Sequence, residues 1–213
     1  MKGIRQMKLV DMTVKGYLET VMSDAPAPGG GSVAALSSTQ GCALVSMVAD
    51  LTLGKEKFAE YFEVCEATKA KMQELYKALY DGVDNDTDAF MKVSAAYKMP
   101  KDTDELKAAR SAAIRAANVG ATEVPYRTVE LSLEGLRAMK AMAGKFNQNA
   151  ASDFGVAALS FLTGARGAWL NVKINLPGVK DEALQAKFAK AEDMLKEAEE
   201  IAAEIYNDIE KSL

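Results

Sequence analysis

Apolar residues recur at steps of three and four along most of the chain, the spacing that one face of an α-helix requires. The longest such run begins at Phe58, passes Val83 and continues to Tyr97. Asp86 falls at a position of this run where the pattern calls for an apolar side chain. Burying a carboxylate is costly unless it is paired, hydrogen-bonded or protonated. Asp86 is therefore expected to have a polar partner or a raised pKa.

The same spacing, together with capping residues and prolines, predicts helices over nearly the whole chain. Ser32 is the expected N-cap of the second helix. A break in the third helix is expected near Gly82, if one occurs. Pro125 is expected to kink or restart the fourth helix. Asp102 and Glu105 form a capping box. The predicted helices span residues 10–23, 33–53, 55–97, 103–123 with a continuation to 144, 154–172 and 181–212.

The last predicted helix carries apolar residues at alternating steps of four and three, which is the seam of a coiled coil. Such a seam packs within a bundle or against a second subunit. No segment shows the alternation of a strand, and alanine, leucine, lysine, glutamate and methionine dominate. The sequence thus predicts an all-α fold, a bundle of long helices that forms a single domain over residues 1–213 and dimerises.

Two prolines and three glycines interrupt the helical pattern in Pro-Ala-Pro-Gly-Gly-Gly-Ser, residues 26–32. An ordinary turn between helices accounts for this composition. A ligand cradle accounts for it as well, because a helix N-terminus offers free N–H groups and glycines let a ligand reach them. The segment is neither a dinucleotide fingerprint nor a Walker loop, since no strand precedes it and no Gly-Lys-Ser/Thr follows.

Composition narrows the classes of function. The formal net charge is −4 and no basic stripe with aromatic residues occurs, so we expect no nucleic-acid partner. No apolar run follows the first residues, so we expect no membrane span and a cytoplasmic location. Cys42 and Cys65 lie in apolar helical patterns and are expected to be reduced and buried. The chain has no histidine, which excludes Ser-His and Cys-His triads and leaves Asp, Glu, Lys, Tyr and Cys for proton transfer.

Asp84, Asp86 and Asp88 are spaced like the first three ligands of a calcium-binding loop. The required glycine is replaced by Ala89 and the required glutamate by Ala95, so an EF-hand is rejected. Pattern alone then leaves two readings. The chain is either a helical interaction protein, or an enzyme in which buried acids, the glycine turn and asparagine clusters converge.

Four stretches of the chain together resemble one family. They are Pro-Ala-Pro-Gly-Gly-Gly-Ser-Val-Ala-Ala-Leu (26–36), Leu-Thr-Leu-Gly-Lys (51–55), Asp-Thr-Asp-Ala-Phe (86–90) with Met-Pro-Lys (99–101), and residues 149–153 followed by Asn-Val-Lys-Ile-Asn-Leu (171–176). In this order and spacing they resemble the cyclodeaminase/cyclohydrolase family of folate metabolism, over nearly the whole chain. Its members are formimidoyltetrahydrofolate cyclodeaminases and methenyltetrahydrofolate cyclohydrolases.

The resemblance implies an all-helical homodimer with a folate site at the subunit interface, and no metal or redox cofactor. The implied substrates are tetrahydrofolate adducts, polyglutamylated forms included. A cyclodeaminase converts 5-formimidoyltetrahydrofolate to 5,10-methenyltetrahydrofolate and ammonia, and this is the reaction we expect. The alternative is a cyclohydrolase, which adds water to the methenyl carbon and yields 10-formyltetrahydrofolate. A helical folate-binding or scaffold protein without catalysis is the second alternative.

Within this resemblance, Asp86 is the expected acid or base, since burial brings the pKa of a carboxylate toward working pH. Asp153 is the expected second acid/base or the group that holds the cationic carbon. Lys101 and Arg110 are expected to pair with the glutamate of the folate or to orient the carboxylates. Lys101 is also expected to be a catalytic residue. The remaining predicted substrate-binding residues are Pro28, Gly29, Gly30, Gly31, Ser32, Asn147, Asn149, Asn171 and Asn175.

Overall fold

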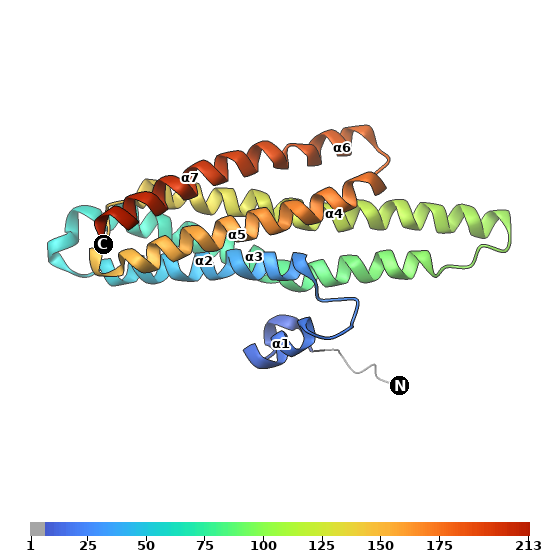
Figure 1. Cartoon of the computed structure of the whole chain (residues 1–213), viewed down its shortest axis with the longest axis horizontal. Helices are drawn as coiled ribbons and strands as arrows, with labels where there is room; N and C mark the ends of the chain where they lie inside the picture. Colours follow the sequence, from blue (N-terminus) through green and yellow to red (C-terminus); the bar gives the residue numbers. More distant parts are fainter. Residues whose placement is uncertain (1–6) are drawn as a thin grey trace.

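Four long helices lie side by side and form the bundle on which the other elements pack (Figure 1). The computed structural model describes residues 7–213, which contain no strand. The bundle consists of α2 (Gly30–Thr52), α3 (Phe62–Tyr97), α4 (Asp104–Met142) and α5 (Ala151–Asn175), and the other helices are α1 (Val14–Val21), α6 (Glu182–Ala189) and α7 (Ala191–Ser212). Short 3₁₀-helices span Leu9–Asp11, Glu56–Tyr61, Gln148–Ala150 and Leu176–Gly178. The predicted all-α bundle is confirmed.

The core of the bundle is filled by the apolar faces that the sequence spacing indicated. Met72, Leu75 and Leu79 of α3 are at most 1% exposed, as is Phe161 of α5. Small residues bring α2 and α5 very close together, because a β-carbon at Gly164 would overlap the Ser38 side chain. Both cysteines are buried and unpaired, as predicted.

Three predicted features of the helices are wrong, and each has a local cause. Gly29, and not Ser32, is the N-cap of α2, because the glycines enter the helix and the Ser32 hydroxyl turns toward the Val83 carbonyl. α3 is unbroken at Gly82, which packs against Ala35 of α2. α4 runs through Pro125 as one helix, so it does not restart there.

The other boundaries differ by less. Thr103, and not Asp102, caps α4 and accepts a hydrogen bond from the Leu106 N–H. The predicted last helix is divided at Lys190 into α6 and α7. The apolar side of α7 packs on α4 and α5 of the same chain, so this seam is used within the bundle.

The N-terminal arm projects from one side of the bundle, where it packs on α2 and α3 (Figure 1). It consists of the 3₁₀-helix Leu9–Asp11, α1 and the segment that leads into α2. The carboxylate of Asp84 on α3 holds the arm by accepting hydrogen bonds from the Leu9 N–H at 2.7 Å and the Val10 N–H at 3.5 Å. The arm ends at the start of α2, which lies against Asp86 of α3.

α2 is the helix in the described part of the chain that is long and apolar enough to cross a membrane. It packs between α3 and α5, and 56% of its most apolar window is buried. Its hydropathy is that of a central helix in a bundle.

Candidate active site

Asp86 lies in the second half of α3, where its partly buried carboxylate faces the first turn of α2. A cavity of about 310 Å³ opens beside it. The cavity is lined by Pro26, Ala27, Gly29, Gly30, Gly31, Asp86, Phe90, Val93, Ala121, Asn171, Ile174 and Asn175. The predicted site residues that share this cavity are Asp86, Gly29, Gly30, Gly31, Asn171 and Asn175.

The first turn of α2 comes into direct contact with the Asp86 carboxylate. A β-carbon on Gly31 would overlap the carboxylate, so any side chain there would displace it. The N–H groups of a first helical turn have no partner within the helix and favour a negative charge. The N–H of Ser32 is among the groups that lower the pKa of Asp86. The glycine segment therefore forms part of the cavity as well as a turn.

The Ser32 hydroxyl lies at the centre of a small buried network. Its oxygen is 2.7 Å from the Val83 carbonyl oxygen and 3.3 Å from Asp86 Oδ2. A serine hydroxyl has one proton to donate, and the shorter distance assigns that proton to the Val83 carbonyl. The longer contact therefore gives an ionised Asp86 only a weak hydrogen bond from the Ser32 hydroxyl. The contacts with Ser32 favour the ionised carboxylate, but only modestly.

Burial raises the pKa of Asp86 above its usual value, and the side chain and backbone N–H of Ser32 oppose that shift without cancelling it. This is the raised pKa that the apolar spacing of α3 predicted. A raised pKa brings a carboxyl closer to the working pH, which suits general acid and base catalysis.

Two asparagines on the last turns of α5 form the wall opposite Asp86. Pro125 has no N–H, so the Ala121 carbonyl four residues earlier in α4 lacks its usual helical partner. Asn175 supplies that partner, because its Nδ2 donates to the Ala121 oxygen at 2.7 Å. Asn171 Nδ2 donates to the Gly167 oxygen at 2.9 Å within α5. Both amides are thus held in fixed orientations at the cavity.

The predicted basic residues lie farther along α3 and α4, toward the tip of the hairpin that these helices form. Lys101 is exposed in the loop between them, and α3 extends roughly 16 Å from Asp86 to Tyr97 before that loop. The guanidinium of Arg110 donates to the Tyr97 carbonyl at 3.1 Å and lies over the Tyr97 ring. Within one chain, neither residue is brought next to Asp86.

Asp153, Asn149 and Asn147 lie at the other end of α5 from Asn171. Eighteen residues separate Asp153 from Asn171, which is about 27 Å along a helix axis. The Asn147 side chain is 7% exposed and donates to the Leu51 carbonyl at 3.2 Å, so it fastens the turn before α5 to the end of α2. One chain therefore does not bring these residues to the cavity, and their role in binding stays a prediction.

Pro28 is buried in the segment before α2 and lines a neighbouring acidic cavity with Asp81, Asp84 and Asp88. The sequence reasoning missed the contribution of Ala121, which lines the candidate cavity. Ala121 would have been found from Pro125, since a proline within a helix frees the carbonyl four residues before it.

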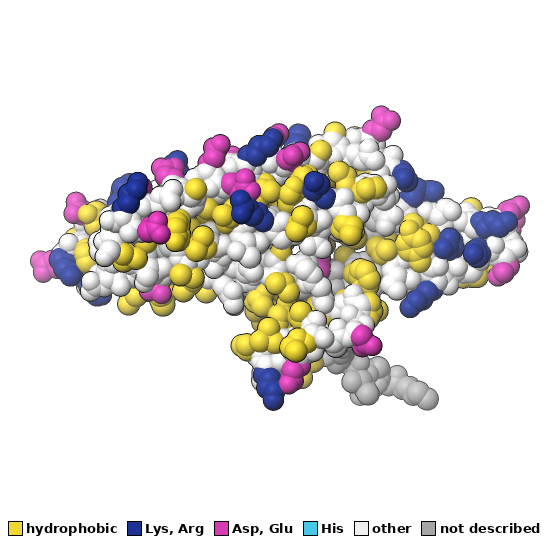
Figure 2. Space-filling model, in the orientation of Figure 1, with side chains coloured by type: hydrophobic (Ala, Val, Ile, Leu, Met, Phe, Trp, Pro, Cys, Tyr) yellow, Lys and Arg dark blue, Asp and Glu magenta, His cyan; other side chains and the backbone are white. Residues whose placement is uncertain are grey.

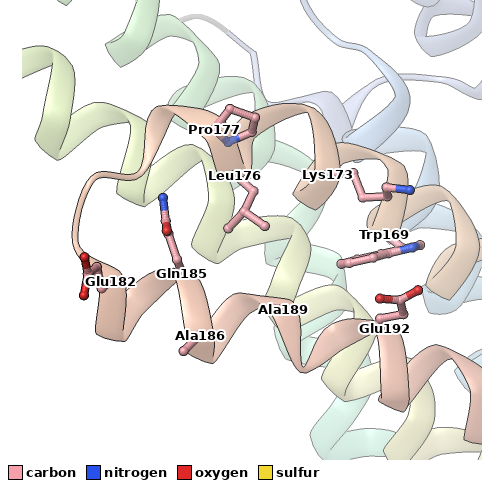
Figure 3. Close-up of a pocket in the computed structure, with 9 residues that line it drawn as sticks. All are labelled: Trp169, Lys173, Leu176, Pro177, Glu182, Gln185, Ala186, Ala189 and Glu192. Atoms are coloured by element: carbon pink, nitrogen blue, oxygen red, sulfur yellow. The ribbon is translucent and has the colours of Figure 1, made fainter.

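A larger cavity, of about 680 Å³, lies between the end of α5 and α6 (Figure 3). Trp169, Leu176 and Ala186 line it with several other residues, and Lys173 and Glu192 stand near its edge. Trp169 and Lys173 lie on a different side of α5 from Asn171 and Asn175. Asp86 is not among its lining residues, so the larger cavity is separate from the candidate active site.

Comparison with known proteins gives matches over almost the whole chain. The family described as formiminotransferase-cyclodeaminase matches residues 13–208. A methenyltetrahydrofolate cyclohydrolase of Methylorubrum extorquens is 42% identical over 192 residues, which cover 90% of this chain and 89% of that protein. The formimidoyltransferase-cyclodeaminase of Mus musculus is 32% identical over 206 residues, and the match spans only 38% of its length.

A solved structure has the same fold. The structure of formiminotetrahydrofolate cyclodeaminase from Thermotoga maritima is similar with a TM-score of 0.78 and 26% sequence identity, and the match covers 94% of each chain.

Proposed function

The chain belongs to the formiminotransferase-cyclodeaminase family, and from this we propose that it is a folate one-carbon enzyme with methenyltetrahydrofolate cyclohydrolase activity. The observation that carries the choice is the 42% identity to a cyclohydrolase of nearly the same extent. The preference expected from the sequence alone, for the cyclodeaminase, is reversed here. The cyclodeaminase becomes the second candidate, because the Thermotoga maritima structure and the Mus musculus relative carry that name.

In the proposed reaction Asp86 acts first as a base and then as an acid. Its carboxylate takes a proton from water as the water oxygen bonds to the methenyl carbon. The carbon–N5 bond then breaks as Asp86 returns that proton to N5. The hydroxyl proton leaves to solvent as the formyl C=O forms, so each turnover releases one proton. The raised pKa of Asp86 suits both steps, since the same group must first accept a proton and then release it.

The cavity walls supply binding. The free N–H groups of the first turn of α2 and the asparagines of α5 face a ligand from two sides of Asp86. Lys101 and Arg110, toward the tip of the α3–α4 hairpin, are proposed to attract the glutamate end of the folate, away from the reacting carbon. The two buried thiols fit a reducing compartment, and we place the reaction in the cytoplasm.

Methenyl absorbance distinguishes the candidate functions. We expect purified protein to consume 5,10-methenyltetrahydrofolate, so that its absorbance falls faster than in buffer alone. A rise with 5-formimidoyltetrahydrofolate would support the cyclodeaminase instead. No change with either substrate would support a binding or scaffold protein. A lower KM for a polyglutamylated substrate, lost on changing Lys101 and Arg110 to glutamine, would support the role of these two residues.

We also propose that two copies pack through the outer faces of α2 and α5. α2 has no charged residue before Asp50, and Figure 2 shows that the middle of this side of the molecule is mostly uncharged, while charged side chains gather along α7 and at the α3–α4 tip. The exposed large apolar residues on these helices are Val33, Met47, Leu51, Val156, Leu159, Leu170 and Ile174. A two-fold axis across α5 would place the Asn149 and Asp153 end of one copy near the Asn171 and Asn175 end of the other.

A charge placed on this face tests the dimer. Leu159→Glu is expected to convert a dimer to a monomer in sedimentation and to lower activity, because a carboxylate would be buried between the copies. Tyr76→Glu on α3 is the matched control, since Tyr76 is 40% exposed and Leu159 is 41% exposed. A Leu159→Glu protein that remains dimeric would show that the copies meet elsewhere.

A further inference from the structure

Tyr17 of the N-terminal arm lies against the part of α2 and α3 that holds Asp86. Its side chain is 7% exposed and packs in a small core with Leu9, Ala35 and Val83. The Val83 carbonyl accepts a hydrogen bond from the Ser32 hydroxyl, and Ala35 is one turn beyond Ser32 in α2. The Tyr17 ring therefore packs beside the residues that surround Ser32 and Asp86.

The Tyr17 hydroxyl is buried and has no hydrogen-bond partner within residues 7–213. A buried hydroxyl without a partner is unfavourable, and phenylalanine would fill the same space without that cost. Burial, and then the nearby Asp86 and Asp84 carboxylates, raise the pKa of Tyr17. The phenol is therefore neutral at working pH and can act as a donor toward these acids.

The two acids differ in what they still lack. Asp84 accepts hydrogen bonds from the Leu9 and Val10 N–H groups and is already satisfied. Asp86 has the Ser32 hydroxyl at 3.3 Å, but that hydroxyl donates to the Val83 carbonyl at 2.7 Å. An ionised Asp86 has the Ser32 N–H as a donor as well. A carboxylate can accept more hydrogen bonds than these, and the Tyr17 hydroxyl has a proton that no described residue accepts.

We propose that Tyr17 is a positioning residue for Asp86, whose hydroxyl donates a hydrogen bond, through one bridging water, to the ionised Asp86 carboxylate. A bridging water accounts for a polar pair that lies beyond direct hydrogen-bond distance. This role deepens the proposed function and rests on it, since it assigns Tyr17 to the stabilisation of Asp86 while that residue waits to accept a proton. This hydrogen bond favours the ionised form of Asp86, whereas burial favours the protonated form.

Other titratable groups around Asp86 do not offer the same contact. α2 contributes none between Gly30 and Gly41. Within about two helical turns of Asp86, α3 itself carries Tyr80, Asp81, Asp84, Asp88 and Lys92. The arm carries Lys8, Asp11, Lys15 and Glu19 on its exposed side, α4 carries Glu123, which is paired with Lys187, and α5 carries the exposed Lys173.

Tyr17→Phe tests the proposal in the active enzyme. Loss of a donor to the ionised form is expected to move the limb of the pH–rate profile that belongs to Asp86 upward by roughly one pH unit. On the acidic limb this is about a tenfold loss of rate at fixed pH. Tyr80→Phe is the control, because the Tyr80 hydroxyl bonds the Val10 carbonyl in the same arm. A folded Tyr17→Phe enzyme with an unmoved profile, whatever its rate, would overturn the proposal.

A double-mutant cycle tests the same contact without any folate reaction. The unfolding free energy is measured against pH for wild type, Tyr17→Phe, Asp86→Asn and the double variant. We expect the effect of Tyr17→Phe to grow with pH when Asp86 is present and to be independent of pH in the Asp86→Asn background. An effect that depends on pH equally in both backgrounds, or in neither, contradicts the contact. A protein that turns over no folate yet shows the coupling would leave Tyr17 and Asp86 paired and refute only the proposed reaction.

Discussion

Asp86→Asn is expected to lower kcat by about 10²- to 10⁴-fold, the usual contribution of a positioned acid or base. The amide has nearly the same shape and can still donate to Ser32 Oγ, so the network around it is kept. It cannot accept a proton from water or return one to N5. KM is expected to change little, because the cavity walls are unaltered. Steady-state kinetics with the methenyl substrate measure both quantities.

The same variant has an expected effect on stability. The folded-state pKa of Asp86 is raised, so its contribution to stability is present at low pH and is lost as pH rises from near 3.8 through the folded-state pKa. Asparagine has no such loss. Asp86→Asn is therefore expected to be at least as stable as wild type at neutral pH, with an advantage that shrinks toward pH 4 in urea unfolding. Full turnover by a folded Asp86→Asn enzyme would refute the catalytic role.

Gly31→Ala is expected to reduce kcat by 10²-fold or more, on the order of losing the acid or base itself. The added methyl would overlap the Asp86 carboxylate, which must then turn away from Ser32 and the α2 N-terminus. Overpacking of this kind also costs about 1–3 kcal/mol of stability. Kinetics and urea unfolding of the same preparation separate the two effects.

Gly120→Ala is the matched control for Gly31→Ala. Gly120 is exposed on α4, and a β-carbon there meets nothing within 4 Å. Alanine in a helix interior is favoured over glycine by up to about 1 kcal/mol, so this variant is expected to be active and slightly more stable. If Gly31→Ala were as active as Gly120→Ala, the carboxylate position would not matter for turnover.

The sequence predicted the helical bundle and the position of Asp86 because both depend on local spacing. A carboxylate in an apolar series must find a polar neighbour, and it finds Ser32. The sequence could not predict the proposed role of Tyr17, because the N-terminal arm is held on α3 by a hydrogen bond from the Leu9 N–H to the Asp84 carboxylate, 75 residues away. Nor could it separate Asp153 from Asp86, since helix directions decide that.

Pro125 shows how a local rule was outweighed. The residue breaks or kinks an isolated helix by removing one hydrogen bond. Here the freed Ala121 carbonyl is satisfied by Asn175 from another helix, and the part of α4 from Ala121 onward packs on α3 and α5. Tertiary contacts therefore kept continuous a helix that the sequence predicted to kink or restart.

The bonds to Ala121 and Gly167 also fix the chemical character of the α5 wall. Because Asn175 and Asn171 each use one N–H of the side-chain amide on a backbone carbonyl, each keeps one N–H and its side-chain oxygen for a ligand. The wall therefore presents donors and acceptors side by side in fixed positions. A molecule that binds well against it must turn toward α5 an edge on which N–H groups and carbonyl oxygens alternate, as they do in an amide.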